Sequence, residues 1–104
     1  MIDYRERFNL QGKIAVVLGA ASGIGQASAQ ALGALGAHVI CADRDVSGAR
    51  ATAESLDLAE WVETDAARGD AIEALATKVL ADHGRVDIAA VSYTHLTLPT
   101  ICSV

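Results

Sequence analysis

The amino-acid sequence predicts an α/β domain built on a doubly wound parallel sheet of about four strands, in the order 3-2-1-4, with helices on both faces. Three observations support this fold class. Short, continuous apolar runs alternate with segments whose apolar residues recur at helical spacing. Glycine follows the first run and two of the helical segments. Strands separated by helices pair in parallel through right-handed crossovers, and such sheets are covered on both faces.

The predicted elements begin at residue 14. Ile14–Leu18 is an apolar run rich in β-branched residues, as expected of a buried parallel strand. The pattern then changes to helical spacing, and the stripe expected to face the sheet consists of Ile24, Ala27, Ala31, Leu32 and Leu35. Gly36 is placed to end this helix, because a residue with positive φ commonly follows a helix C-terminus.

The alternation continues to residue 88. His38–Ala42 is predicted as the second strand, Trp61–Glu63 begins the third, and Val86 with Ile88 opens the fourth. The short helix between the second and third strands is marked by Ala49, Ala53 and Leu56. Gly84 closes the last helix, whose regular apolar stripe is Ile72, Leu75, Ala76, Val79, Leu80 and His83.

Composition and charge restrict the partners of the chain. With 104 residues, 52% of them apolar and 20% charged, it is expected to form one small globular domain. The net charge of −5, without a basic stripe, argues against nucleic acid as a partner. No run is apolar enough for a membrane span, and Met1–Arg7 lacks the apolar stretch of a secretory signal. Two isolated cysteines predict no disulfide framework and no metal site, and they fit a cytoplasmic location; Cys41, like Trp61, is expected in the core.

A glycine-rich turn between the first strand and the first helix carries the functional prediction. It spans Leu18–Gly25 and has glycine at positions 19, 23 and 25. Glycine permits positive φ and lets a pyrophosphate approach the N–H groups of a helix N-terminus, where unpaired donors and the helix dipole favour an anion. Gly25 allows close packing of helix and strand, and Ser22 can add a hydroxyl donor. The alternative is a turn whose glycines serve geometry alone.

Asp43 favours dinucleotide binding over a purely structural turn. It ends the second strand, where a carboxylate can accept hydrogen bonds from the adenosine ribose hydroxyls. A 2′-phosphate at the same place would meet a like charge, so NAD is expected in preference to NADP. Arg44 is the counter-argument, because its guanidinium can pair with a 2′-phosphate. The ligand crevice is expected between the first and fourth strands, beyond their carboxyl ends.

These segments resemble the opening of the short-chain dehydrogenase/reductase family, over about residues 8–90. The Gly-x-x-x-Gly-x-Gly spacing and the segments at 42–44, 63–65 and 84–88 carry the similarity. The resemblance implies a Rossmann-type fold, with an NAD-binding half-domain over residues 1–90. It also implies that the cofactor contacts Gly19, Ser22, Gly23, Ile24, Gly25, Asp43, Arg44, Asp65 and Ala66.

Two of these contacts have alternatives, and two positions depart from the family pattern. Asp65 would meet the adenine amino group, or else is a turn or cap acid before the third helix. Arg44 covers the adenine ring or is simply solvated.

The family usually has threonine at the position of Leu18, a tolerable loss because backbone donors make most phosphate contacts. The Asn-Asn-Ala-Gly segment expected after the fourth strand is replaced by Val91–Thr94, which removes part of the cofactor wall.

The resemblance implies an oxidoreductase that transfers hydride between NAD(H) and an alcohol or carbonyl compound, as a homo-oligomer when intact. This chemistry uses a tyrosine, a lysine four residues later and a serine. Neither Lys13 nor Lys78 follows a tyrosine at that spacing, so no catalytic residue is assigned and the chain alone is expected to be inactive. His83 is interpreted as a partner of the helix dipole rather than a catalyst. A non-catalytic, dinucleotide-sensing module is the alternative; a flavin enzyme is less favoured, because such folds usually begin with Gly-x-Gly-x-x-Gly.

The composition changes at Val91. From there to Val104 the chain has no charged residue and no alanine. Val91–Thr100 matches the translation of a tagmentation adapter used for sequencing libraries, GTC TCT TAT ACA CAT CTG ACG CTG CCG ACG. The bases that follow in the adapter give a codon beginning with A, two index codons, valine and stop, which fits residues 101–104. Residues 91–104 are therefore expected to be a non-native tail, with a natural threonine-rich strand and loop as the alternative.

Overall fold

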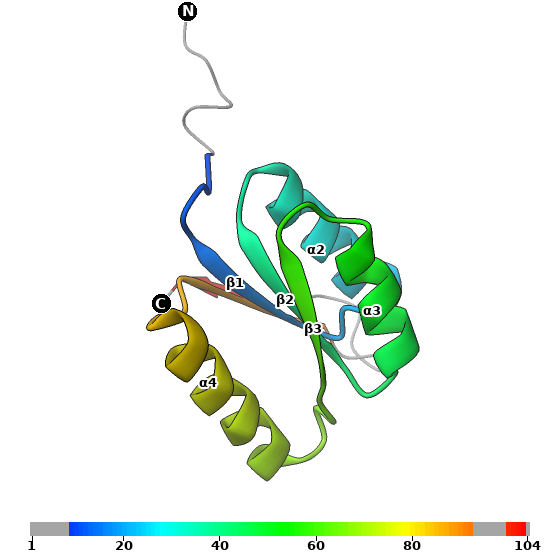
Figure 1. Ribbon diagram of the computed structural model, residues 1–104. Coiled ribbons are helices and arrows are strands. Elements are labelled where there is room, and N and C mark those ends of the chain that lie inside the picture. Colours follow the sequence, from blue (N-terminus) through cyan, green and yellow to red (C-terminus); the bar gives the residue numbers. More distant parts are fainter. Residues whose placement is uncertain (1–8, 93–99, 104) are drawn as a thin grey trace, which may run out of the picture.

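The computed structural model describes residues 9–92 and 100–103, which form a five-stranded sheet with helices on both faces (Figure 1). The elements in chain order are β1 (Ile14–Leu18), α2 (Gly23–Ala34), β2 (His38–Asp43), α3 (Val46–Glu54), β3 (Ala59–Glu63), α4 (Gly69–His83), β4 (Ile88–Val91) and β5 (Thr100–Ser103). The strand order is β3-β2-β1-β4-β5, and β1 to β4 are parallel. The predicted fold class and the 3-2-1-4 order are confirmed. None of the helices in the described part of the chain could cross a bilayer.

Each face of the sheet has its own apolar core. Helices α2 and α3 cover one face and α4 covers the other (Figure 1). On the α2–α3 face the buried strand residues include Val17 and Cys41. On the α4 face, Leu18 and Ile40 cluster with Val79 of the helix. Successive residues of β1 and β2 point to opposite faces, so β1 and residues 39–42 of β2 are apolar on both faces.

Two predictions about buried side chains are wrong. The buried residues of α2 are Gly25 and Ala29, whereas the expected stripe is exposed at Ile24, Ala27, Ala31 and Leu35. Small residues let the helix approach the sheet closely, which leaves Ile24 and Leu35 outside the contact, whereas Leu32 is partly buried against the core. Trp61 is 41% exposed because β3 is an edge strand, and its ring lies 5.4 Å from the guanidinium carbon of Arg50 on α3.

The far edge of the sheet involves the segment expected to be non-native. β5 is antiparallel to β4, and their register pairs Ile88 with Ser103 and Val91 with Thr100. Val91, the first residue of the expected tail, is thus the last residue of β4. Positions 93–99 and 104 of that tail lie outside the described residues. An open strand edge presents unpaired N–H and C=O groups to any nearby segment, so this pairing does not depend on the origin of the segment.

Candidate functional site

The glycine-rich turn lies at the carboxyl edge of the sheet, where β1 leads into α2. β1 is flanked by β2 and β4. The chain leaves β1 for α2 on one face and reaches β4 from α4 on the other, so the winding direction reverses beside β1. Doubly wound sheets bind their ligands at this kind of position. The N–H groups of Gly19 and Ala20 donate to Ala42 O at 2.8 and 3.1 Å, which fixes the turn against β2.

The three glycines of the turn meet different physical requirements. A Cβ on Gly25 would overlap the Gly19 carbonyl oxygen and lie 2.6 Å from its carbon. Gly19 has φ of +92°, and a Cβ there would overlap the Ser92 carbonyl oxygen. Gly23 has φ of +60°, which favours glycine, but a Cβ there would meet no atom of the described residues within 4 Å. Close backbone contacts therefore require Gly19 and Gly25, whereas Gly23 is favoured by its backbone conformation alone.

The N-cap and first turn of α2 contain no acidic residue. The N-cap residue Ser22 makes no side-chain capping hydrogen bond. By contrast, Asp45 caps α3 by accepting from Gly48 N at 3.1 Å, and α4 has Asp70 in its first turn. The first N–H groups of a helix have no partner within it. Among the helices of the described residues, α2 alone therefore leaves its positive end to an external anion.

The residues around this helix end differ in exposure. Ser22, Gly23 and Ile24 are exposed, Ile24 with 45% of its surface, above the buried Gly25. Leu18, at the family's threonine position, is buried in the core on the α4 face and so points away from α2. The structure thus brings the predicted residues of the turn together at one exposed helix end.

Asp43 ends β2 beside the turn and is tied to it. Its Oδ2 accepts a hydrogen bond from the N–H of Ala21 at 3.0 Å, and its Oδ1 accepts from the N–H of Asp45 at 2.9 Å. Each carboxylate oxygen has a further acceptor position, so both can still accept ribose hydroxyls. Asp43 therefore also holds the turn in place, a role that the sequence analysis did not predict. Arg44 beside it is exposed.

Two residues of α3 also position the turn, and the sequence analysis missed both. Thr52 is fully buried, and its hydroxyl donates to Ala20 O at 2.8 Å. Gly48 lies where α3 meets the turn, since a Cβ there would come within 2.6 Å of the Ala21 Cβ. The sequence held one signal for Thr52, because it lies three residues after Ala49 and residues three apart share a helix face. This spacing places Thr52 on the same buried face as Ala49.

Asp65 and Ala66 follow β3 at the same carboxyl edge. Oδ1 of Asp65 accepts from the N–H of Ala67 at 2.9 Å and so closes a turn, while Ala66 packs against the core on the α4 face. The N-cap of α4 is Arg68, so Asp65 is a turn acid and not a helix cap. The ends of β2 and β3 are joined by a 3.0 Å hydrogen bond from Thr64 N to Asp43 O. The two acids expected near the adenosine therefore lie at the carboxyl ends of neighbouring strands, Asp43 as the last residue of β2 and Asp65 two residues after β3.

Comparison with known proteins identifies the family. The model of the short chain dehydrogenase family matches residues 13–92. The chain is 40% identical to D-threitol dehydrogenase of Mycolicibacterium smegmatis, over 78% of this chain and 33% of that enzyme. It resembles a solved metagenomic short-chain oxidoreductase in complex with NADP, with 46% identity and a TM-score of 0.75 over 78% of this chain and 38% of that one. A solved structure named ribose-5-phosphate isomerase from Brucella melitensis is also similar, with 36% identity and a TM-score of 0.79 over 85% of this chain and 34% of that one.

The chain therefore belongs to the short chain dehydrogenase family. It spans about a third of the length of the curated relatives that it matches.

Proposed function

We propose that this chain is the dinucleotide-binding part of a short-chain oxidoreductase, with the cofactor pyrophosphate at the N-terminus of α2. The observation that carries the proposal is the positive end of α2, whose N-cap and first turn contain no acidic residue and where no described residue lies within 4 Å of a Cβ built on Gly23. When bound, a nicotinamide dinucleotide would supply hydride chemistry. One similar structure is named an isomerase, and a fold alone does not decide the reaction. The proposal therefore rests on the residues of this site.

In the proposed intact enzyme, hydride moves between the nicotinamide cofactor and an alcohol or carbonyl compound. The family's tyrosine and lysine have no match in the chain. We infer that they follow Ala90 in the natural gene, that residues 1–90 form the NAD-binding half-domain, and that residues 91–104 are translated adapter. The chain alone should then show no dehydrogenase turnover.

Sequencing of the source DNA and of the intact locus tests this proposal. The adapter codons given above are expected after Ala90, and Tyr-x-x-x-Lys is expected in the natural continuation. Different codons for Tyr93–Thr100 would show that the tail is natural. An intact gene without the tyrosine and lysine would favour the dinucleotide-sensing module instead.

We further propose NAD as the preferred cofactor, on the position of Asp43. A 2′-phosphate bound at the end of β2 would lie next to a carboxylate that the turn holds in place through Ala21 and Asp45. The NADP-bound relative and the exposed Arg44 argue for the other choice. Arg44 would have to offset the charge of Asp43, which cannot turn away without breaking both hydrogen bonds.

A titration of NADH and NADPH against the protein with its restored C-terminal part decides between the two cofactors. We expect NADH to bind at least about tenfold more tightly, which corresponds to roughly 1.4 kcal/mol. Asp43→Asn removes the charge while keeping the size and one acceptor oxygen, so it should shrink or reverse the preference. Thr52→Val is the matched control, because it loosens the turn without a change of charge and should weaken both cofactors alike. An Asp43→Asn variant that keeps the full preference would contradict the assignment.

A further inference from the structure

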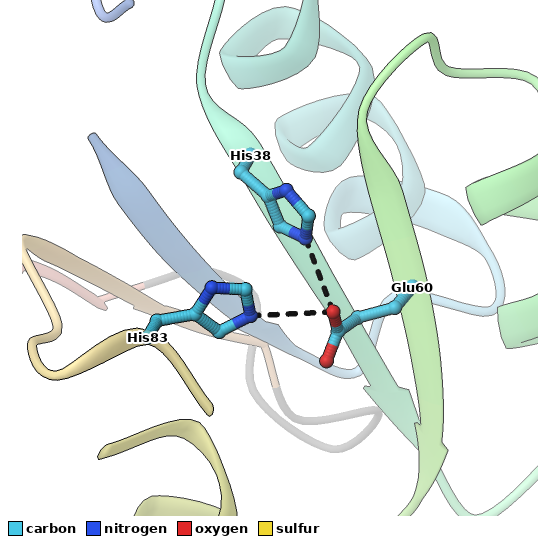
Figure 2. A group of neighbouring side chains, drawn as sticks. All are labelled: His38, Glu60 and His83. Atoms are coloured by element: carbon cyan, nitrogen blue, oxygen red, sulfur yellow. Dashed lines mark hydrogen bonds and ion pairs between the residues drawn. The ribbon is translucent and has the colours of Figure 1, made fainter. Parts of the chain in front are cut away.

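A second group of chemically active side chains lies at the amino edge of the sheet, opposite the glycine-rich turn. His38 is the first residue of β2, Glu60 belongs to β3 and His83 ends α4. Figure 2 shows both imidazole rings directed at the same carboxylate. The Nε2 atom of His38 lies 3.1 Å from Oε2 of Glu60, and the Nε2 atom of His83 lies 3.2 Å from that oxygen.

We propose that His38, Glu60 and His83 bind one divalent transition-metal ion, with zinc as the best match. One ligand atom from each residue lies within 4.8 Å of the other two. Around tetrahedral zinc, bonds of about 2.0–2.1 Å place ligand atoms about 3.3 Å apart. The two histidine–glutamate distances are already close to this value. Only the two imidazole nitrogens have to approach each other, by at most about 1.5 Å.

The donor set selects the class of metal. Two imidazoles and a carboxylate suit zinc and its neighbours in the transition series, whereas magnesium and calcium prefer oxygen ligands alone. Three protein ligands leave a fourth position for water. The side chains of His38, Glu60 and His83 are 28%, 32% and 18% exposed, so an ion can enter from solvent and remain partly shielded.

The surrounding fold holds two of the ligands rigidly and the third on a separate element. β2 and β3 are directly paired, with Ile40 opposite Glu60, so His38 and Glu60 lie on the same face of adjacent strands. His83 comes from the last turn of α4, which packs over that face. A bound ion would therefore link the end of α4 to the edge of the sheet and stabilise the folded chain by mass action.

The same contacts could serve only as hydrogen bonds that hold α4 to the sheet. In that case both imidazoles donate to one oxygen, with ring centroids 4.7 Å apart and planes at 53°. A metal ion instead takes the nitrogen lone pairs and displaces both donor protons. Uptake of one ion therefore separates the two roles.

Calorimetric titration of the untagged, metal-free 104-residue chain with zinc chloride tests the proposal, in a Cys102→Ser background that removes a competing thiol. We expect one equivalent to bind and to raise Tm. Affinity should fall at least about tenfold in His38→Ala, His83→Ala and Glu60→Gln. Glu60→Gln keeps the size and an acceptor oxygen, so its circular dichroism should match that of the parent even if a histidine variant unfolds. His95→Ala is the matched control, a third histidine whose loss should leave binding unchanged.

Three results would overturn the proposal. They are no uptake by the parent chain, equal affinity in the parent and in folded Glu60→Gln, or a loss of binding only in His95→Ala. Cobalt in place of zinc adds a spectroscopic readout, since a four-coordinate site gives strong visible absorption that a weakly held aqueous ion lacks.

Discussion

The substitution Gly25→Ala has two opposite effects on stability, because alanine has the higher helix propensity but its Cβ would clash with the turn. Alanine is favoured over glycine in a helix by at most about 1 kcal/mol. The added Cβ, however, would overlap Gly19 O and lie 2.6 Å from Gly19 C and 3.3 Å from Ala20 N. All three atoms are backbone and cannot rotate away, so α2 must shift by well over about 1 Å to restore ordinary contact. Overpacking of this kind costs about 3 kcal/mol or more, so a net loss of at least about 2 kcal/mol in unfolding free energy is expected.

Gly69→Ala is the matched control for this experiment. Gly69 begins α4 as Gly25 lies near the start of α2, but a Cβ there would meet nothing within 4 Å. Its substitution should be neutral or stabilise by up to about 1 kcal/mol. Urea unfolding followed by circular dichroism and by the fluorescence of Trp61, the only tryptophan, measures both changes. If Gly25→Ala were as stable as Gly69→Ala, the close approach of α2 to the end of β1 would be wrong.

Three further predictions concern other parts of the fold. Thr52→Val should lower the free energy of unfolding in urea by about 1–3 kcal/mol, because it leaves the buried Ala20 carbonyl without its hydroxyl donor. An unchanged urea midpoint would show that this hydrogen bond does not stabilise the turn. Burial raises the pKa of the Cys41 thiol to about 11, so in Cys102→Ser alkylation at neutral pH should require unfolding; rapid labelling of the native chain would contradict this. The hydrogen bond from Ile14 N and the charge of Arg85 lower the pKa of Asp87 in the folded chain. The ionised carboxylate therefore stabilises the fold above the unfolded pKa of about 3.9, and this stabilisation is lost as pH falls through the lower folded pKa. Asp87→Asn should therefore flatten the acid side of the stability curve, and a curve unchanged below about pH 4 would show that this carboxylate contributes nothing there.

The strands of this fold could be predicted closely because burial on both faces leaves a clear trace in the sequence. β1 has the predicted bounds, Ile14–Leu18, and β2 extends the predicted strand by one residue, Asp43. β3 begins two residues earlier than expected, at Ala59, because an edge strand is half-exposed and lacks a continuous apolar run. The same exposure explains why Trp61 is not in the core.

The face of α2 could not be predicted from hydrophobicity because its contact with the sheet is made by the smallest residues. The large apolar residues Ile24 and Leu35, which are exposed, outweigh the buried Gly25 and Ala29 in any periodicity argument. The motif and Asp43 were recognisable as a local pattern. The hydrogen bonds of Asp43 and Thr52 were not, because they depend on how α3 docks against the turn.

The cluster of His38, Glu60 and His83 depends on register in the same way. These residues come from three separate elements, and no metal-ligand spacing in the sequence connects them. Only the pairing of β2 with β3 and the packing of α4 place the three side chains together. The sequence analysis accordingly predicted no metal site.

We propose that the N-terminus of α2 binds the pyrophosphate of a dinucleotide. Backbone amide chemical shifts, followed by NMR while the chain is titrated with NADH, test it at the level of single residues. The largest changes are expected at the amides of Ser22, Gly23, Ile24 and Gly25, and Gly23→Asp, which tolerates the φ of +60° and places a carboxylate beside the expected pyrophosphate, should abolish them. Changes centred on the amino edge around His38 and His83, or equal changes in Gly23→Asp, would show that the pyrophosphate does not bind at this helix end.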